Sequence, residues 1–169
     1  MSLLAQSNET LAVLGGPRTI VGETPELFHW PITTVEDEQA VLQVIRDSAM
    51  SGLDITRAFE EEYAQFIGTE FAPASCSSTA SIAEAMFTVG LGRGDEIIGP
   101  SITYWASLLQ SFAFGATPIF ADINPRALCI DAKDIEHRIT PRTRAFMVVH
   151  YCGHPCDMDS IMAISDDTT

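Results

Sequence analysis

Three short apolar runs in the second half of the chain have the length of buried strands. They lie at Glu96–Gly99, Pro118–Ala121 and Ala145–Val149, and segments with the hydrophobic spacing of helices separate them. Two of the runs end in Gly, Pro, Asp or Asn, the residues that stop strands and shape turns. Strands separated by helices need crossover connections, so we expect an α/β fold with a mostly parallel sheet flanked by helices.

Helical spacing of apolar residues also occupies much of the remaining chain. The pattern Thr33-x-x-Glu36 has the form of a capping box and predicts a helix over residues 35–49. Further helices are expected over about 55–66, 79–89, 103–114 and 131–139 and from about 157 onward, with a short strand at 71–75. In the helix over 79–89, the inward face is expected to hold Ile82, Ala83, Met86 and Phe87. Residues 1–32 are expected to be an N-terminal arm without regular structure, and residues 33–169 to be the domain.

The composition indicates one compact domain or a piece of one. Of 169 residues, 46% are hydrophobic, which is enough for a sizeable core. Lys+Arg 9 against Asp+Glu 23 gives a net charge of −14, which argues against nucleic acid or an anionic membrane surface as a partner. The N-terminus does not have the form of a signal peptide, and no apolar run approaches the ~20 residues of a membrane helix. The 4 cysteines lack the spacing of a disulfide framework, so we expect a cytoplasmic protein.

Ligands of parallel α/β sheets bind at the carboxyl ends of the strands, and hydroxyl and aromatic residues gather there. The segment Ser75–Thr79 consists almost wholly of small residues and precedes the helix over 79–89. A helix N-terminus offers unpaired N–H groups and a positive dipole end, which suit a phosphate, and the hydroxyls of Ser78 and Thr79 would add donors. The alternative is an ordinary Ser/Thr helix cap.

Two aromatic residues follow the first predicted strand of the sheet. Tyr104 and Trp105 come shortly after Gly99-Pro100, where an aromatic ring can stack on a flat cofactor. Packing of both rings in the core is the competing interpretation. His150 ends the third apolar run, where it lies close to a ligand or makes a hydrogen bond within the core.

A metal site is the less favoured interpretation of the segment His150-x-Cys152-x-His154-x-Cys156. Structural zinc sites take their ligands as C-x2–4-C pairs from two separate places, whereas strict alternation in an extended segment does not wrap an ion. Gly153 and Pro155 suggest a turn, which weakens that objection. We therefore predict no metal site.

Four strings in one order give the chain a family resemblance. They are GDEIIGPSITYWAS, GATPIFADINP, ITPRTRA and VHYCGHPCDMDSIMAIS. Together they resemble the sugar aminotransferases of the DegT/StrS type, pyridoxal-phosphate enzymes of fold type I. The strings LGGPRTI, WP and ISDDT are similar to the branch of aminohydroxybenzoate synthase and the scyllo-inosose aminotransferases. The resemblance covers roughly residues 11–167.

The resemblance implies a cofactor, a set of site residues and partners. Pyridoxal 5'-phosphate would be bound by Ser78 and Thr79 at its phosphate, although Ser78 stands where the family usually has Gly. Tyr104 would stack on the pyridine ring, and His150 would lie near the cofactor; Trp105 occupies a position that is usually aliphatic. The amino donor would be glutamate or glutamine, the acceptor a keto-sugar or cyclitol, and the assembly a homodimer.

Two groups that this chemistry needs are not found in the sequence. Pyridoxal-phosphate enzymes attach the cofactor through a lysine and hold its pyridine nitrogen with an acidic residue. Lys133 is the only lysine, and it lies between Asp131 and Asp134 as a solvated charge. In the family, both groups come later than residue 169, so no catalytic residue is expected here. We therefore expect an N-terminal fragment of a fold-type-I large domain, inactive by itself; a pyridoxal-phosphate-dependent sugar dehydratase and a non-catalytic remnant module remain alternatives.

Overall fold

The computed structural model describes residues 10–18, 22, 30–52 and 54–168. They belong to two units, 1–53 and 54–169. In the first unit, the described residues form a single 3-10 turn, η1 (Ala12–Leu14), and one helix, α1 (Val35–Arg46). The expected arm over residues 1–32 therefore contains at least this turn, and most of its other residues lie outside the described part.

Helix α1 begins at Val35, as predicted, but its cap lies one residue later than the predicted capping box. Thr34, not Thr33, is the N-cap: its Oγ1 accepts a hydrogen bond from the Asp37 N–H at 3.4 Å, and the Asp37 carboxylate accepts one from the Thr34 N–H at 2.8 Å. Asp37 takes the place expected for Glu36, because its shorter side chain still reaches back to the cap. The helix ends at Arg46, three residues before the predicted end.

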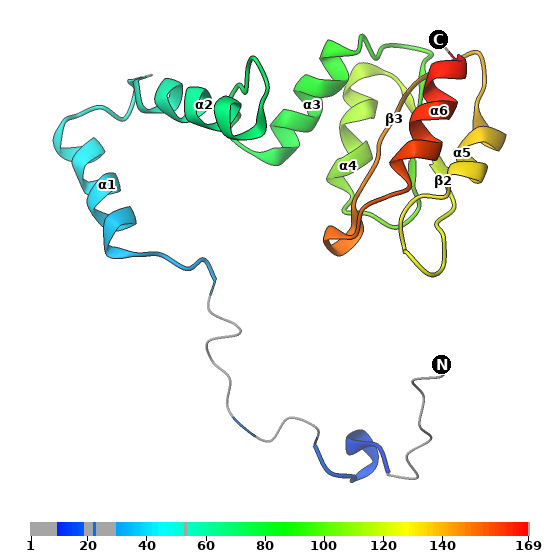
Figure 1. The fold of residues 1–169 in the computed structure, drawn as a ribbon, viewed down its shortest axis with the longest axis horizontal. Helices are drawn as coiled ribbons and strands as arrows, with labels where there is room; N and C mark the ends of the chain where they lie inside the picture. The colour runs from blue at the N-terminus through cyan, green and yellow to red at the C-terminus, as the bar shows by residue number, and fades with distance from the viewer. Residues whose placement is uncertain (1–9, 19–21, 23–29, 53, 169) are drawn as a thin grey trace. The chain divides into compact units, whose positions relative to one another are not determined.

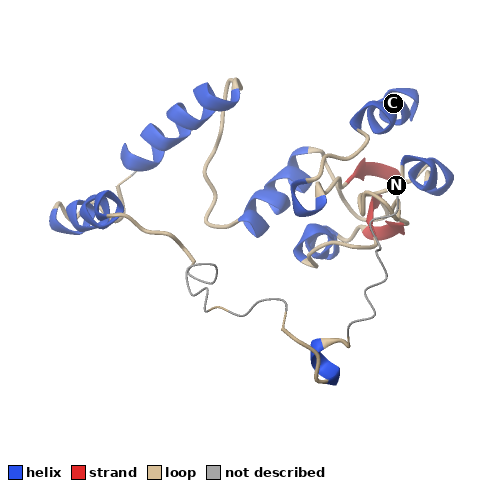
Figure 2. Ribbon diagram, turned by 60° about the horizontal axis from the view of Figure 1, so that its bottom comes forward, coloured by secondary structure: helices blue, strands red, loops and turns tan. Residues whose placement is uncertain are grey.

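The second unit is built on a three-stranded parallel sheet (Figures 1 and 2). Its strands are β1 (Glu96–Pro100), β2 (Thr117–Ala121) and β3 (Thr143–Phe146), in the order β2-β1-β3. The predicted parallel α/β fold is confirmed. The third strand begins two residues before the predicted run, because pairing with β1 starts at Thr143 and continues past an irregularity beside Glu96.

Helices precede, connect and follow the strands. They are α2 (Asp54–Ile67), α3 (Ser78–Thr88), α4 (Ala106–Leu109), η3 (Gln110–Phe114), α5 (Ala132–Arg138), η4 (Tyr151–Gly153) and α6 (Met158–Thr168). The helix predicted over 103–114 is shorter at its start and changes to 3-10 geometry before Gly115, whose φ of 76° ends it. Within the described residues, no helix has both the length and the apolar character to cross a membrane.

Alternation along β1 divides the core into two clusters, one on each face of the sheet. Ile98 packs with Ala121, Ile135 of α5 and Ile161 of α6. Ile97 points to the opposite face and packs with Met86 of α3 and Leu108 of α4, among others. Helices α5 and α6 therefore cover one face, and α3 and α4 cover the other.

Two local predictions are wrong. Residues 71–75 form no strand, because Pro73 has no N–H to donate and the Ala74 N–H donates instead to the Glu60 carboxylate of α2, at 2.8 Å. Phe87 does not share the inward face of α3: Met86 is buried, whereas the Phe87 side chain is 74% exposed. The adjacent Met86 already fills the site against the sheet.

A buried carboxylate joins β1 to the start of β3. The Glu96 carboxylate accepts hydrogen bonds from Thr140 Oγ1 at 2.5 Å and from Arg142 Nε at 2.9 Å, and the Glu96 N–H donates to the Arg142 carbonyl at 2.8 Å. These bonds, first that of Thr140 and then those of Arg142, lower the pKa of Glu96 below its usual range. No sequence motif marks this cluster, since Glu96 lies more than 40 residues before both of its partners.

This cluster predicts a loss of stability in acid. A carboxyl group whose pKa is lower in the folded state stabilises the fold above its unfolded pKa, about 4.3, and this contribution disappears as the pH falls through the folded value. We expect Glu96→Gln to lower the urea midpoint at neutral pH, and we expect the difference from wild type to shrink at about pH 3. Glu62→Gln, on the exposed side of α2, is the control and should leave both midpoints unchanged. A constant difference between wild type and Glu96→Gln at all pH values would contradict the assignment.

Candidate functional site

The carboxyl edge of the sheet gathers the chain segments in which the sequence places ligand-binding residues. The ends of β1 and β2 lie level, because the Ser101 N–H donates to the Ala121 carbonyl at 2.9 Å. A turn over residues 89–95 joins the end of α3 to the start of β1, so α3 runs back along the strand and its N-terminus points towards this edge. The segments that follow β1 and β3 carry Tyr104 and His150.

The N-terminus of α3 is a helix cap that leaves two amides of the first turn without a partner in the helix. Ser77 is the N-cap, with extended backbone, and its Oγ accepts a hydrogen bond from the Ala80 N–H at 3.2 Å. The helix begins at Ser78, so the amides of Ser78 and Thr79 belong to the first turn and have no partner within the helix. Ser78 does not have positive φ, so a residue with a Cβ stands here without backbone strain in place of the family's Gly.

The Tyr104 ring lies outside the core. Its side chain is 67% exposed and that of Trp105 is 61% exposed, so the packing of both rings in the core is ruled out for this chain. Tyr104 follows the central strand of the sheet, and its ring lies beside that of Trp105. Among the described residues, no hydrogen bond joins Ser78, Thr79, Tyr104 and His150.

A hydrogen bond fixes the tautomer of the His150 ring. His150 is exposed, and its Nδ1 accepts a hydrogen bond from the Cys156 N–H at 3.1 Å. A neutral imidazole that accepts at Nδ1 carries its proton on Nε2, so His150 offers an N–H donor from Nε2. The sequence alone could not show this, because the donor is a backbone group six residues away.

The two cysteines after β3 differ in burial. Cys156 is buried, and its Sγ donates to the Val149 carbonyl at 3.2 Å, whereas Cys152 is exposed. Burial raises the pKa of Cys156 to about 11, and a hydrogen bond with the Cys129 thiol adds to the shift. A thiol held protonated is a poor metal ligand. In the described part of the chain, no three His, Cys, Asp or Glu side chains are grouped to hold a metal ion.

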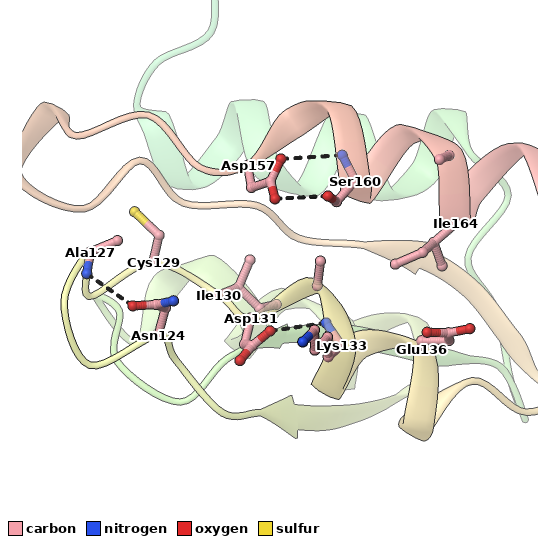
Figure 3. Close-up of a pocket in the computed structure, with 12 residues that line it drawn as sticks. Asn124, Ala127, Cys129, Ile130, Asp131, Lys133, Glu136, Asp157, Ser160 and Ile164 are labelled. Carbon is pink, nitrogen blue, oxygen red and sulfur yellow. Dashed lines mark hydrogen bonds between the residues drawn. The ribbon is translucent and has the colours of Figure 1, made fainter.

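A groove of about 530 Å³ runs between α5 and α6, on the face of the sheet opposite α3 and α4 (Figure 3). Its polar groups make local bonds: the Asp157 carboxylate accepts hydrogen bonds from the N–H and Oγ of Ser160, and the Asp131 carboxylate accepts one from the Lys133 N–H at 3.0 Å. These carboxylates serve as helix caps. Lys133, the only lysine in the chain, lines this groove at the start of α5, on the face of the sheet opposite α3 and α4.

Comparison with known proteins identifies the family. The model of the DegT/DnrJ/EryC1/StrS aminotransferase family matches residues 31–169. The chain belongs to this family. The spore coat polysaccharide biosynthesis protein SpsC of Bacillus subtilis (strain 168) is 36% identical over 140 residues, which are 83% of this chain and 36% of that protein.

Solved structures of related proteins have the same fold. An aminotransferase from Psychrobacter cryohalolentis aligns with a TM-score of 0.78 and 32% identity, over 83% of this chain and 36% of that one. 3-Amino-5-hydroxybenzoic acid (AHBA) synthase aligns with a TM-score of 0.77 and 28% identity, over 83% and 37%. NtdA from Bacillus subtilis, solved with bound cofactor PMP, aligns with a TM-score of 0.73 and 30% identity, over 79% and 32%. The expected resemblance and fold are confirmed, and the chain spans only about a third of the length of these relatives.

Proposed function

We propose that this member of the DegT/DnrJ/EryC1/StrS aminotransferase family supplies the cofactor-binding wall of an enzyme that transfers an amino group to a keto-sugar or cyclitol. One observation carries the proposal. The segments at one edge of the sheet hold both the unpaired amides of Ser78 and Thr79 and the exposed ring of Tyr104. The cofactor is pyridoxal phosphate, as its bound forms in related structures suggest. When bound, pyridoxal phosphate supplies the electron sink for amino transfer.

The residues present fit the cofactor. The amides and hydroxyls of Ser78 and Thr79 would donate to the phosphate, with the positive end of the α3 dipole behind them. The Tyr104 ring would lie against the pyridine, which fixes the plane of the cofactor and keeps water from one of its faces. The Nε2–H of His150 would donate to an acceptor atom of the cofactor or substrate. Glutamate or glutamine as donor, and a homodimer as the assembly, remain predictions.

The binding experiment compares pyridoxamine phosphate with pyridoxamine, which differ only in the phosphate group. In equilibrium dialysis, we expect the chain to bind pyridoxamine phosphate at least about a hundredfold more tightly than pyridoxamine, because the charge-assisted hydrogen bonds to the two α3 amides, about 1.5–3 kcal/mol each, are lost with the phosphate. Equal binding of the two compounds, or no binding of either, would refute the proposal.

We further propose that these 169 residues do not attach the cofactor covalently. A lysine that reacts with an aldehyde at neutral pH needs a lowered pKa, from a desolvated site or a neighbouring cation. Lys133 is exposed at the start of α5, on the opposite side of the sheet from α3 and α4. The alternative function is that of a sugar dehydratase. The related dehydratase structure is only 24% identical to this chain, so it supports a shared fold and no more.

The prediction for Lys133 is a negative spectrum. After incubation with pyridoxal phosphate and dialysis, we expect no visible absorbance of attached cofactor, and we expect the same of Lys133→Ala. A band that survives dialysis in wild type would contradict the prediction. If Lys133→Ala lost that band, Lys133 would be the attachment site.

A further inference from the structure

Tyr104 and Trp105 form one exposed two-ring surface at the middle of the carboxyl edge. Their ring centroids are 5.4 Å apart, and the two side chains are 67% and 61% exposed. They follow β1, the strand between the other two, where ligands of such sheets bind. The pair therefore stands where a substrate and a cofactor would meet.

The backbone beneath the two rings is held in place. The Ser107 N–H donates to the Tyr104 carbonyl at 3.0 Å, and the Leu109 N–H donates to the Trp105 carbonyl at 3.1 Å. The hydroxyls of Thr103 and Ser107 share a hydrogen bond of 2.8 Å across the turn. Residues 106–108, directly after the pair, are buried. The rings thus project from a fixed base, which lowers the entropy lost when a ligand binds to them.

The angle between the two rings prevents one flat ligand from stacking on both. Their planes are inclined by 47°. A flat ring that lies parallel to the Tyr104 ring is therefore inclined by the same angle to the Trp105 ring, and one planar ligand cannot stack on both. If Tyr104 receives the pyridine of the cofactor, Trp105 remains open to a second ring.

We propose that Trp105 is the stacking surface for the ring of the amino acceptor, a saturated ring that carries hydroxyl groups, as in a cyclic sugar or a cyclitol. The C–H groups on the face of such a ring bear partial positive charge, and the face of an indole bears partial negative charge, so the two surfaces attract. The hydroxyls around the rim stay free for water and polar groups. The inference rests on the proposed function and adds to it the residue that recognises the ring of the substrate.

The test is saturation-transfer NMR of the full chain with myo-inositol, and with sorbitol as the control. Sorbitol has the same number of carbons and hydroxyls but no ring. We expect saturation of the aromatic protons to reach the C–H protons of myo-inositol and much less those of sorbitol. Trp105→Leu should weaken the binding of myo-inositol about fivefold, the ratio typical of one lost stacking contact, whereas Trp105→Phe should retain most of it. Trp30→Leu removes the other tryptophan, 85% exposed and in the first unit, and should change nothing.

The outcomes separate this inference from the proposed function. Tyr104→Leu should weaken the binding of pyridoxamine phosphate and keep the myo-inositol signal. If pyridoxamine phosphate binds to wild type, but myo-inositol gives no more signal than sorbitol or gives the same signal with Trp105→Leu, the role of Trp105 is refuted and the proposed function stands. An equal loss in Trp30→Leu would also refute it. Far-UV circular dichroism of each variant confirms that the helices remain.

Discussion

Ser78→Pro is expected to bind pyridoxamine phosphate at least about tenfold more weakly than wild type, with the fold intact. Ser78 is the first residue of α3, a position where proline is well tolerated because its ring is compatible with the first turn. Ser77 before it has φ of −168° and ψ of 159°, an extended conformation that a following proline accepts. The substitution therefore removes one amide donor and one hydroxyl from the proposed phosphate site and leaves the helix in place. One lost hydrogen bond to a charged group costs about 1.5–3 kcal/mol, so the loss of one donor already weakens binding at least about tenfold.

Ala132→Pro is the matched control for this variant. Ala132 is the first residue of α5, and Asp131 before it is also extended, with φ of −87° and ψ of 118°. This variant should bind pyridoxamine phosphate as wild type does, since α5 covers the other face of the sheet. Equilibrium dialysis measures the binding, and circular dichroism confirms the helix content. Unchanged affinity in Ser78→Pro, or an equal loss in Ala132→Pro, would show that the amides of α3 do not hold the phosphate.

The three strands could be predicted from the sequence because each is a short apolar run between helical patterns, and the run of the central strand is the clearest. A strand between two others shows a continuous apolar run, and all five residues of β1 are buried. The helices before and after β1 could be predicted from the spacing of their apolar residues and from the glycines that follow them. Gly90 and Gly115 do have the positive φ that ends a helix. These signals are local, so a single sequence is sufficient to carry them.

The predictions failed where contacts between residues distant in the sequence determine the local structure. Residues 71–75 have the composition of a strand, but the Glu60 carboxylate takes the Ala74 N–H that a strand would offer. The early start of β3 depends on its register with β1, and the Glu96 cluster depends on Thr140 and Arg142, which are distant in sequence. Spacing along the chain contains no information about such partners.

The position of the candidate site stays a prediction. The rule that ligands bind at carboxyl ends of parallel strands pointed to the segments that carry Tyr104 and His150, and the family resemblance favoured Tyr104 among the residues there. The burial of Cys156, the tautomer that its amide gives to His150, and the inclination of the Trp105 ring are consequences of how the turns after β1 and β3 fold. Each determines which atom or face is available to a ligand.

The largest effect on stability is expected from Ile98→Ala. Ile98 is 0% exposed, lies in the central strand and packs with the cluster that holds α5 and α6 on the sheet. Removing three carbons from such a site costs about 2–5 kcal/mol, through lost transfer free energy and the cavity that remains. The whole stability of a domain is about 5–15 kcal/mol, so the variant should lie close to its unfolding transition at room temperature.

A graded series makes this prediction measurable. Ile98→Val should cost about 1 kcal/mol, which leaves a folded protein whose urea midpoint can be compared directly with wild type. Ile55→Ala makes the same deletion on α2, where the side chain is 57% exposed, and surface changes of this kind usually stay within about 0.5 kcal/mol. Urea unfolding followed by circular dichroism gives all three values. Equal costs for Ile98→Ala and Ile55→Ala would mean that β1 does not form the centre of the core, and the carboxyl edge that carries Tyr104 and Trp105 would lose its physical basis.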